Sequence, residues 1–209
     1  MRTFILLLLL FGLSFSSCKK KDLEFKLKGN IKSLNNGYNL QGVNVKIYTF
    51  GLGNNIEELK GSAQTDASGN YELDIERSKF EKLIIKISKT NYFEEAKTYY
   101  FDDLSTENDN HTDHTLSPKS YTRFILKNQI PNSVNDQLKI FKVSGKTDCE
   151  ECCPNGNTFY TGLVDEIVLC ANDGDTYMKF YWWVNGNEQY GVDSVYNTPF
   201  ETIDFTINY

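Results

Sequence analysis

The last eight residues of the chain alternate strictly between apolar and polar side chains. Ile203, Phe205, Ile207 and Tyr209 are the apolar members, and Thr, Asp, Thr and Asn precede them in turn. Because successive side chains of a strand point to opposite faces, this period of two predicts a strand with one face on a core. Similar alternation recurs along a chain rich in Tyr, Phe, Val, Ile and Thr, and Asn and Gly interrupt it. This texture predicts an all-β protein.

Four segments of the first half have strand character. Phe25–Lys28, Val43–Tyr48 and Tyr71–Ile75 alternate, whereas Leu83–Ile87 is continuously apolar and predicts a central strand. Between the second and third of these segments, Asp66 to Asn70 forms a turn sequence. We expect a hairpin there, with Gly69 supplying a positive φ.

The second half of the chain again has segments with strand character, after a change of composition. Residues 101–110 are acidic and polar, and Pro118 follows soon afterwards, which marks a boundary. Tyr121–Asn128 is then predicted to be a strand, Leu138–Val143 the strand that returns, and the final segment the closing strand. The 192 residues after residue 17 fit two domains. We therefore predict two consecutive β-sandwich domains, at 23–117 and 118–209.

The first 17 residues have the order of a secretory signal. Arg2 precedes an apolar stretch from Phe4 to Phe15, and two serines then lead directly to Cys18. The apolar stretch is too short to span a bilayer. Ordinary secretion with cleavage after Ser17 is one interpretation of this leader.

Because the small residues end on cysteine, the leader resembles a bacterial lipoprotein signal. The resemblance implies a signal peptide at 1–17, lipidation of Cys18 and a tether at 18–22. Two or three acyl chains would hold the protein stably on a membrane. We therefore predict the membrane as a partner, through the lipid anchor. Lys19 after the cysteine is similar to outer-membrane lipoproteins, and the leader resembles those of Bacteroidetes. We expect a lipid anchor in the outer membrane, facing the periplasm or the cell surface.

Charge excludes one class of partner. Removing Arg2 with the leader leaves 21 basic against 28 acidic side chains, a formal charge of −7. Binding to a nucleic-acid backbone requires a clustered basic surface, which this acidic chain lacks. We therefore expect no nucleic-acid partner.

The first half also resembles a known domain family. The matching residues are Gly29, Ile31, Leu40, Gly42, Val43, Val45, Thr65, Asp66, Gly69, Tyr71, Asn91 and Tyr92. At these residues the first half of the chain is similar to the carboxypeptidase regulatory-like domain, which is a prealbumin-like or immunoglobulin-like β-sandwich. The resemblance implies a stability or spacer module without catalytic residues. It does not imply peptidase activity, because no peptidase domain accompanies it.

Metal-capable side chains gather near the predicted boundary, at Asp109, His111, Asp113 and His114. On a strand, the spacing of the two histidines points them to opposite faces, so a shared site needs a turn or a helix. Asp66 is the other candidate, but an Asx turn to its own backbone is the simpler interpretation. We predict no metal site and no cofactor.

Four cysteines remain once Cys18 is assigned to lipid. Cys149, Cys152 and Cys153 lie in a loop, and Cys170 lies in a predicted strand. In an oxidising compartment an even number predicts disulfides, for which three pairings exist. We expect Cys170 to join one of the loop cysteines and to stabilise the fold by roughly 3 kcal/mol. A zinc site and a redox-active C-x2-C are the alternatives.

The segment from Tyr177 to Val184 carries the strongest functional signal. Met178, Phe180, Trp182 and Val184 would share one strand face and form core. Tyr177, Tyr181 and Trp183 would lie on the other face and could bind a glycan or an envelope protein. The alternative is that they pack under a loop or on the first domain.

These features predict a non-enzymatic, membrane-anchored lipoprotein with no catalytic residues, because the chain contains no Ser/His/Asp set, phosphate loop or acid pair. Its first domain would be a spacer and its second a module that binds a ligand or a partner. A purely structural component of an envelope assembly is the alternative, and a metal-binding or enzymatic accessory protein is a third class.

Overall fold

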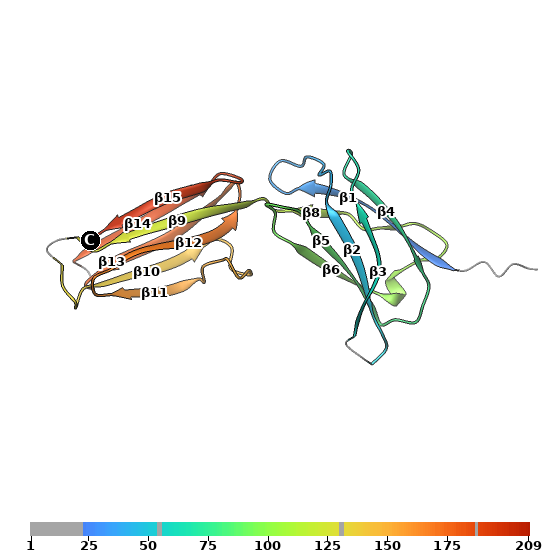
Figure 1. Ribbon diagram of the computed structural model, residues 1–209, viewed down its shortest axis with the longest axis horizontal. Helices are drawn as coiled ribbons and strands as arrows, with labels where there is room; N and C mark the ends of the chain where they lie inside the picture. Colours follow the sequence, from blue (N-terminus) through green and yellow to red (C-terminus); the bar gives the residue numbers. More distant parts are fainter. Residues whose placement is uncertain (1–22, 54–55, 130–131, 187) are drawn as a thin grey trace, which may run out of the picture.

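The computed structural model describes residues 23–53, 56–129, 132–186 and 188–209. The predicted leader and Cys18 lie outside the described residues. Within them, the chain forms fifteen strands and one short 3-10 helix, η1, at Phe101–Asp103. The predicted all-β class is confirmed, and the strands form two β-sandwiches arranged end to end (Figure 1).

The first sandwich contains eight strands. They are β1 (Glu24–Ser33), β2 (Asn44–Phe50), β3 (Glu57–Gln64), β4 (Asn70–Glu76), β5 (Lys82–Ser88), β6 (Glu95–Tyr100), β7 (Asn110–His111) and β8 (His114–Leu116). One sheet has the order β4-β1-β7, with β8 also pairing with β1, and the other has the order β3-β2-β5-β6. As predicted, the apolar strand β5 is central. Alternate residues of β1 and β2, such as Phe25, Leu27 and Ile47, fill the core between the sheets.

The hairpin expected at Asp66–Asn70 is wrong. Strand β3 pairs with β2 whereas β4 pairs with β1, so the turn crosses from one sheet to the other. The Thr65 hydroxyl accepts a hydrogen bond from the Val43 N–H, and the Gly69 carbonyl accepts one from the Ile31 N–H. These two hydrogen bonds attach the two ends of the turn to different sheets. Two predicted details are confirmed. Gly69 has a φ of +75°, and Asp66 closes an Asx turn by accepting from the N–H groups of residues 68 and 70.

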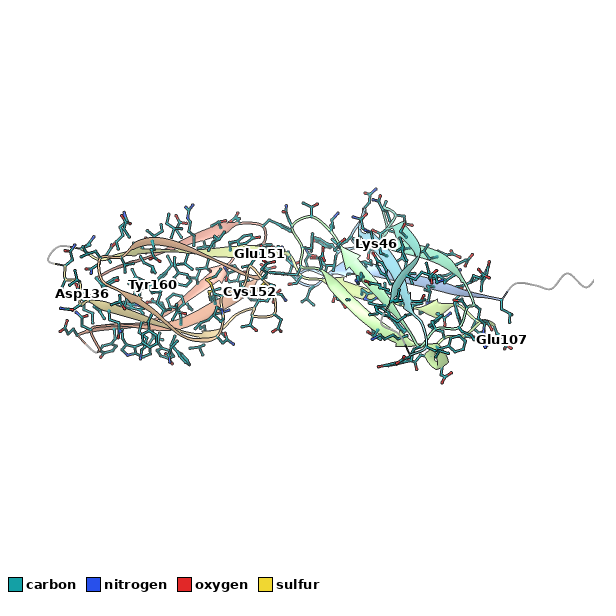
Figure 2. The ribbon with its side chains drawn as sticks, turned by 60° about the horizontal axis from the view of Figure 1, so that its bottom comes forward. Lys46, Glu107, Asp136, Glu151, Cys152 and Tyr160 are labelled. Carbon is teal, nitrogen blue, oxygen red and sulfur yellow. A yellow bond between two sulfur atoms is a disulfide. The ribbon has the colours of Figure 1, made fainter. Side chains whose placement is uncertain are left out.

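The second sandwich contains the remaining strands. They are β9 (Lys119–Lys127), β10 (Gln137–Ser144), β11 (Gly156–Thr161), β12 (Asp165–Asp173), β13 (Thr176–Val184), β14 (Gln189–Asn197) and β15 (Thr202–Asn208). The sheets have the orders β11-β10-β13-β14 and β12-β9-β15. Figure 2 shows their side chains meeting between the sheets, where Tyr160 packs on the core.

The sequence had suggested that β10 returns beside β9, but it does not. Both edges of β9 are occupied, by β12 on one side and by the parallel strand β15 on the other. Strand β10 therefore crosses to the opposite sheet and pairs with β11 and β13. The closing strand is confirmed, since Ile207 is buried and Ile203, Phe205 and Tyr209 pack on the same core.

The two hydrophobic cores are separate along the chain. Leu116 is the last residue of the first core and Phe124 is the first residue of the second. Backbone hydrogen bonds join the chain segments that lie between the two cores. The Tyr92 ring also contacts the Phe200 ring there, with centroids 5.3 Å apart. Asn91 has a φ of 65° at this joint.

Disulfides are confirmed for the four cysteines of the second sandwich. Cys153 is bonded to the buried Cys170 of β12, and Cys149 is bonded to Cys152 within the loop. Cys170 therefore pairs with a loop cysteine, as expected. The cysteine loop lies at the end of the second sandwich that faces the first, where Figure 2 labels Glu151 and Cys152.

A buried lysine ties the cysteine loop to the sheet beneath it. The Lys142 ammonium donates to the carbonyls of Lys146 and Cys153, at 2.6 and 2.5 Å. Burial lowers the pKa of Lys142 below its usual value. Asn172 continues this network by accepting from the Lys146 N–H and donating to Asn197. Because these buried polar groups are paired, the loop has one defined position.

The two disulfides should differ in what they contribute. The Cys153–Cys170 bond spans 17 residues, so its replacement by two alanines should lower the free energy of unfolding by about 3 kcal/mol. The Cys149–Cys152 bond spans only 3 residues, and its removal should cost about 1.5 kcal/mol. Urea denaturation of the two double variants measures both values. Equal losses would contradict this difference.

Candidate functional site

The candidate site is the outer surface of the sheet β11-β10-β13-β14. About half of the outward side chains on these strands are aromatic, and we call the surface formed by their apolar members the aromatic face. Its members are Phe141, Phe159, Tyr177, Tyr181, Trp183, Tyr190, Val192 and Tyr196.

One row of this face crosses all four strands. Trp183 lies opposite Tyr190 of β14 and Lys139 of β10, and Lys139 lies opposite Phe159 of β11. The Lys139 ammonium lies 3.8 Å from the centroid of the Trp183 ring, a cation–π contact. Tyr190 is 71% exposed. The row therefore combines apolar rings with one positive charge.

The next row is centred on Tyr181. Its ring stacks on that of Trp183, with centroids 5.8 Å apart and planes 22° apart. Phe141 and Val192 flank it on the neighbouring strands. Tyr181 remains 38% exposed, so the stacked pair is open to solvent on its outer side.

The face ends in a tyrosine pair with a fixed hydroxyl. Tyr177 and Tyr196 lie opposite each other with ring centroids 5.1 Å apart. The Tyr196 hydroxyl donates to Asp175 at 2.8 Å, and this hydrogen bond raises the pKa of Tyr196. A polar anchor thus holds one end of the apolar surface.

The opposite side of β13 holds the aromatic face rigidly. Met178, Phe180 and Val184 are buried, as predicted for this set. The fourth member, Trp182, is partly buried, and its indole N–H donates to Asp193 at 2.9 Å. The Trp182 ring lies over Gly191, where a Cβ would overlap the indole. The backbone of β13 and β14 is therefore fixed from beneath.

Only part of this surface was predicted from the sequence. The predicted residues Tyr177, Tyr181 and Trp183 lie together on the outward side of β13. Tyr190, Val192 and Tyr196 come from β14, and Phe141 and Phe159 from β10 and β11. The alternation of residues 190–196 signals a strand face, but the sequence does not say which strands are neighbours.

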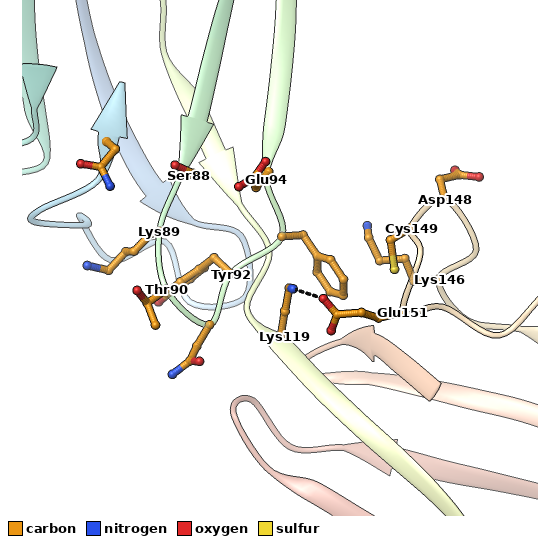
Figure 3. A pocket seen from close by; sticks show the side chains of 13 residues that line it. Ser88, Lys89, Thr90, Tyr92, Glu94, Lys119, Lys146, Asp148, Cys149 and Glu151 are labelled. Atoms are coloured by element: carbon orange, nitrogen blue, oxygen red, sulfur yellow. Dashed lines mark hydrogen bonds and ion pairs between the residues drawn. The ribbon is translucent and has the colours of Figure 1, made fainter. Parts of the chain in front are cut away.

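The joint between the sandwiches forms a groove of about 660 Å³ (Figure 3). Two of its lysines already have partners, since Lys119 binds Glu151 at 2.7 Å and Lys146 binds Asp173 at 3.2 Å. Phe93 is buried and contacts both ammonium groups. These pairs favour a structural role for the groove in joining the sandwiches.

The two histidines do not share a site. His111 on β7 is exposed, whereas the side chain of His114 on β8 is fully buried beside Glu95, at 3.4 Å. Asp109 pairs with Lys28, and Asp113 accepts from the Asn30 N–H. Among the residues that the structure describes, no group of three or more potential ligands could hold a metal ion.

Within the described ranges, no helix has the length and apolar character to cross a membrane.

Comparison with known proteins gives structural neighbours but no family. No family model matches the chain, and no curated protein matches it. The Bacillus anthracis TIE protein is 14% identical over 89% of this chain, with a TM-score of 0.37. A streptococcal ancillary pilin is 11% identical over 90%, with a TM-score of 0.35. This chain spans 34% of the first protein and 63% of the second.

A third structure is the shaft pilin SpaA of Lactobacillus rhamnosus GG. It is 7% identical over 88% of this chain and 97% of its own, with a TM-score of 0.37. Such low values establish neither a family nor a function.

Burial of His114 should make stability depend on pH. Burial lowers the pKa of His114, and the hydrogen bond to Glu95 opposes this only in part. The unfolded chain therefore binds this proton more readily, so stability is lost as pH falls below the ordinary value of about 6.5. Thermal unfolding of the wild type between pH 7 and 5 measures the loss.

A His114→Leu variant should lose this part of the pH dependence, whereas His111→Gln should retain it. The interpretation would be wrong if His114→Leu and the wild type lost equal stability over this range.

Proposed function

We propose that this chain is a non-enzymatic lipoprotein of the bacterial outer membrane that binds a polysaccharide through its aromatic face. Residues 1–17 are the signal peptide, Cys18 carries the lipid and residues 18–22 form the tether. A carboxypeptidase regulatory-like sandwich at 23–117 is the spacer, and the sandwich at 118–209 is the binding module. The observation that carries the proposal is the exposed, rigid aromatic face on one sheet of the second sandwich.

The composition of the face favours a sugar chain. Tyrosine and tryptophan combine an apolar ring with a polar group, so they stack on the C–H faces of sugars while hydroxyls remain available for hydrogen bonds. Lys179 and Ser194 lie on the same side between the rings and supply further donors. The described members of the face include no leucine, isoleucine or methionine.

The dimensions of the face suit an extended ligand. From Tyr177 to Trp183 the strand rises by about 20 Å, and the four strands extend over about 14 Å. An open sheet surface of this size follows a linear polymer better than it encloses a small molecule, since small ligands bind in concave pockets.

The arrangement of the two sandwiches supports the spacer role. Strand β1 begins at the end of the first sandwich that is opposite to the second sandwich (Figure 1). Its ten residues extend over about 30 Å towards the joint. A lipid on Cys18 would therefore keep the aromatic face well away from the membrane.

Truncation of the stacked rings should weaken binding. We expect Trp183→Ala and Tyr181→Ala each to weaken binding to purified cell-surface polysaccharide about tenfold or more, by analogy with aromatic stacking on bases. Affinity electrophoresis or calorimetry measures this loss, and circular dichroism checks the fold. Leu169→Ala is a matched control, because Leu169 is exposed on the opposite sheet.

Unchanged affinity in both aromatic variants would rule out this surface. If no polysaccharide binds and cross-linking on cells instead captures fixed protein neighbours, the chain is a structural component of an envelope assembly.

The anchor has its own test. Cys18→Ser should abolish metabolic labelling by palmitate and release the protein from membranes into the soluble fraction, because the acyl chains supply the membrane affinity. Retention of the unlabelled variant on membranes would contradict a lipid anchor at Cys18.

A further inference from the structure

The end of the first sandwich where β1 begins carries an apolar groove. Glu24 lies opposite Glu76 of β4, and Lys82 of β5 lies between Phe50 and Tyr100, so the ends of five strands meet here. We call this the tether end. It is the end of the first sandwich that is farther from the joint (Figure 1).

The groove has a volume of about 460 Å³. Phe80 and Phe101 contact each other with ring centroids 5.1 Å apart, and both contact Phe25 of the core. Leu52 and Tyr100 also line it and are 66% and 57% exposed. Large apolar side chains thus remain open to solvent over an aromatic base.

Basic side chains lie next to these rings. The Arg77 guanidinium lies 5.3 Å from the Phe101 ring centroid, and Lys79 lines the groove. Apolar side chains beside arginine and lysine are typical of surfaces that lie in the headgroup region of a bilayer.

The length of the tether limits the distance between this end and the membrane. Four residues separate Cys18 from Leu23, the first described residue, so the five steps from Cys18 to Leu23 reach at most about 18 Å when fully extended. An acylated Cys18 would therefore hold the tether end within that distance of the lipid surface, so the bilayer is the occupant that the chain itself brings to the groove.

We propose that the tether end contacts the phospholipid surface through Leu52, Tyr100 and the groove between them. This inference rests on the lipid anchor of the proposed function and adds a second, protein-mediated contact. That contact would hold the spacer at a fixed angle to the membrane and direct the second sandwich away from it.

The charges at this end select the kind of lipid. The described acidic residues here include Glu24, Glu57, Glu76, Glu81, Asp102 and Asp103, and the basic residues are Arg77, Lys79 and Lys82. The tether sequence adds Asp22 and three lysines, Lys19 to Lys21, so basic side chains do not outnumber acidic ones. A surface without an excess of basic side chains suits zwitterionic headgroups rather than a strongly anionic leaflet.

Tryptophan reporters test this contact in the intact lipidated protein. Leu52→Trp and Tyr100→Trp are reconstituted into phosphatidylcholine vesicles with and without brominated acyl chains, and the emission of the native tryptophans is subtracted. The added emission should shift to shorter wavelength and lose several-fold more intensity in brominated vesicles than that of the controls.

Leu34→Trp and Tyr38→Trp are the matched controls. Both residues are similarly exposed, at 62% and 72%, and they follow β1 at the joint end, about 30 Å away. Vesicle flotation is measured on the same samples. Replacing a third of the lipid by phosphatidylglycerol should weaken the quenching at residues 52 and 100.

The outcomes separate the two proposals. If the protein floats with the vesicles but the reporters at residues 52 and 100 behave like the controls, the membrane contact is wrong and the anchor stands. If the protein does not float, the anchor fails and this inference fails with it. Shielding of the two reporters on cells, without quenching by brominated lipid, would assign the tether end to a protein neighbour and overturn the proposal.

Discussion

Burial of every second side chain between two facing sheets is the constraint on which the rest of this structure depends. In β13, Met178, Phe180 and Val184 enter the core and Trp182 packs against it, so the residues that alternate with them must point outwards. Tyr181 and Trp183 face outwards for this reason, and not because a loop carries them; Tyr181 is exposed and Trp183 is half-buried. The same packing makes the aromatic face rigid, which lowers the entropy that a ligand would lose on binding.

The end of the second sandwich near the joint is held by polar contacts instead. Glu151, between the two cysteines of the short disulfide, accepts from Lys119 and from the Tyr121 hydroxyl, and both bonds lower the pKa of its carboxyl. Lys142 supports the same loop from within the sandwich. Because Lys119 and Tyr121 belong to the first strand after the joint, the cysteine loop stabilises the position at which the second sandwich begins.

The sequence predicted strands and faces well because they depend on local periodicity. Alternation identified β13 and β15, and Cys170 was correctly expected to pair with a loop cysteine. Prediction from the sequence failed where strand pairing depends on residues that are far apart in the chain. The hairpin at Asp66–Asn70 and the return of Leu138–Val143 beside β9 were wrong, because β1 and β15 compete for those positions. Tyr190 and Phe159 were missed in the aromatic face for the same reason.

The indole N–H signals of the two neighbouring tryptophans provide the most direct measurement. In a nuclear magnetic resonance titration with purified cell-surface polysaccharide, we predict a progressive shift of the Trp183 signal. The Trp182 signal should change little, because its N–H is bonded to Asp193 on the inner side of the strand. A shift of neither signal at saturating polysaccharide, or of Trp182 alone, would contradict binding at the aromatic face.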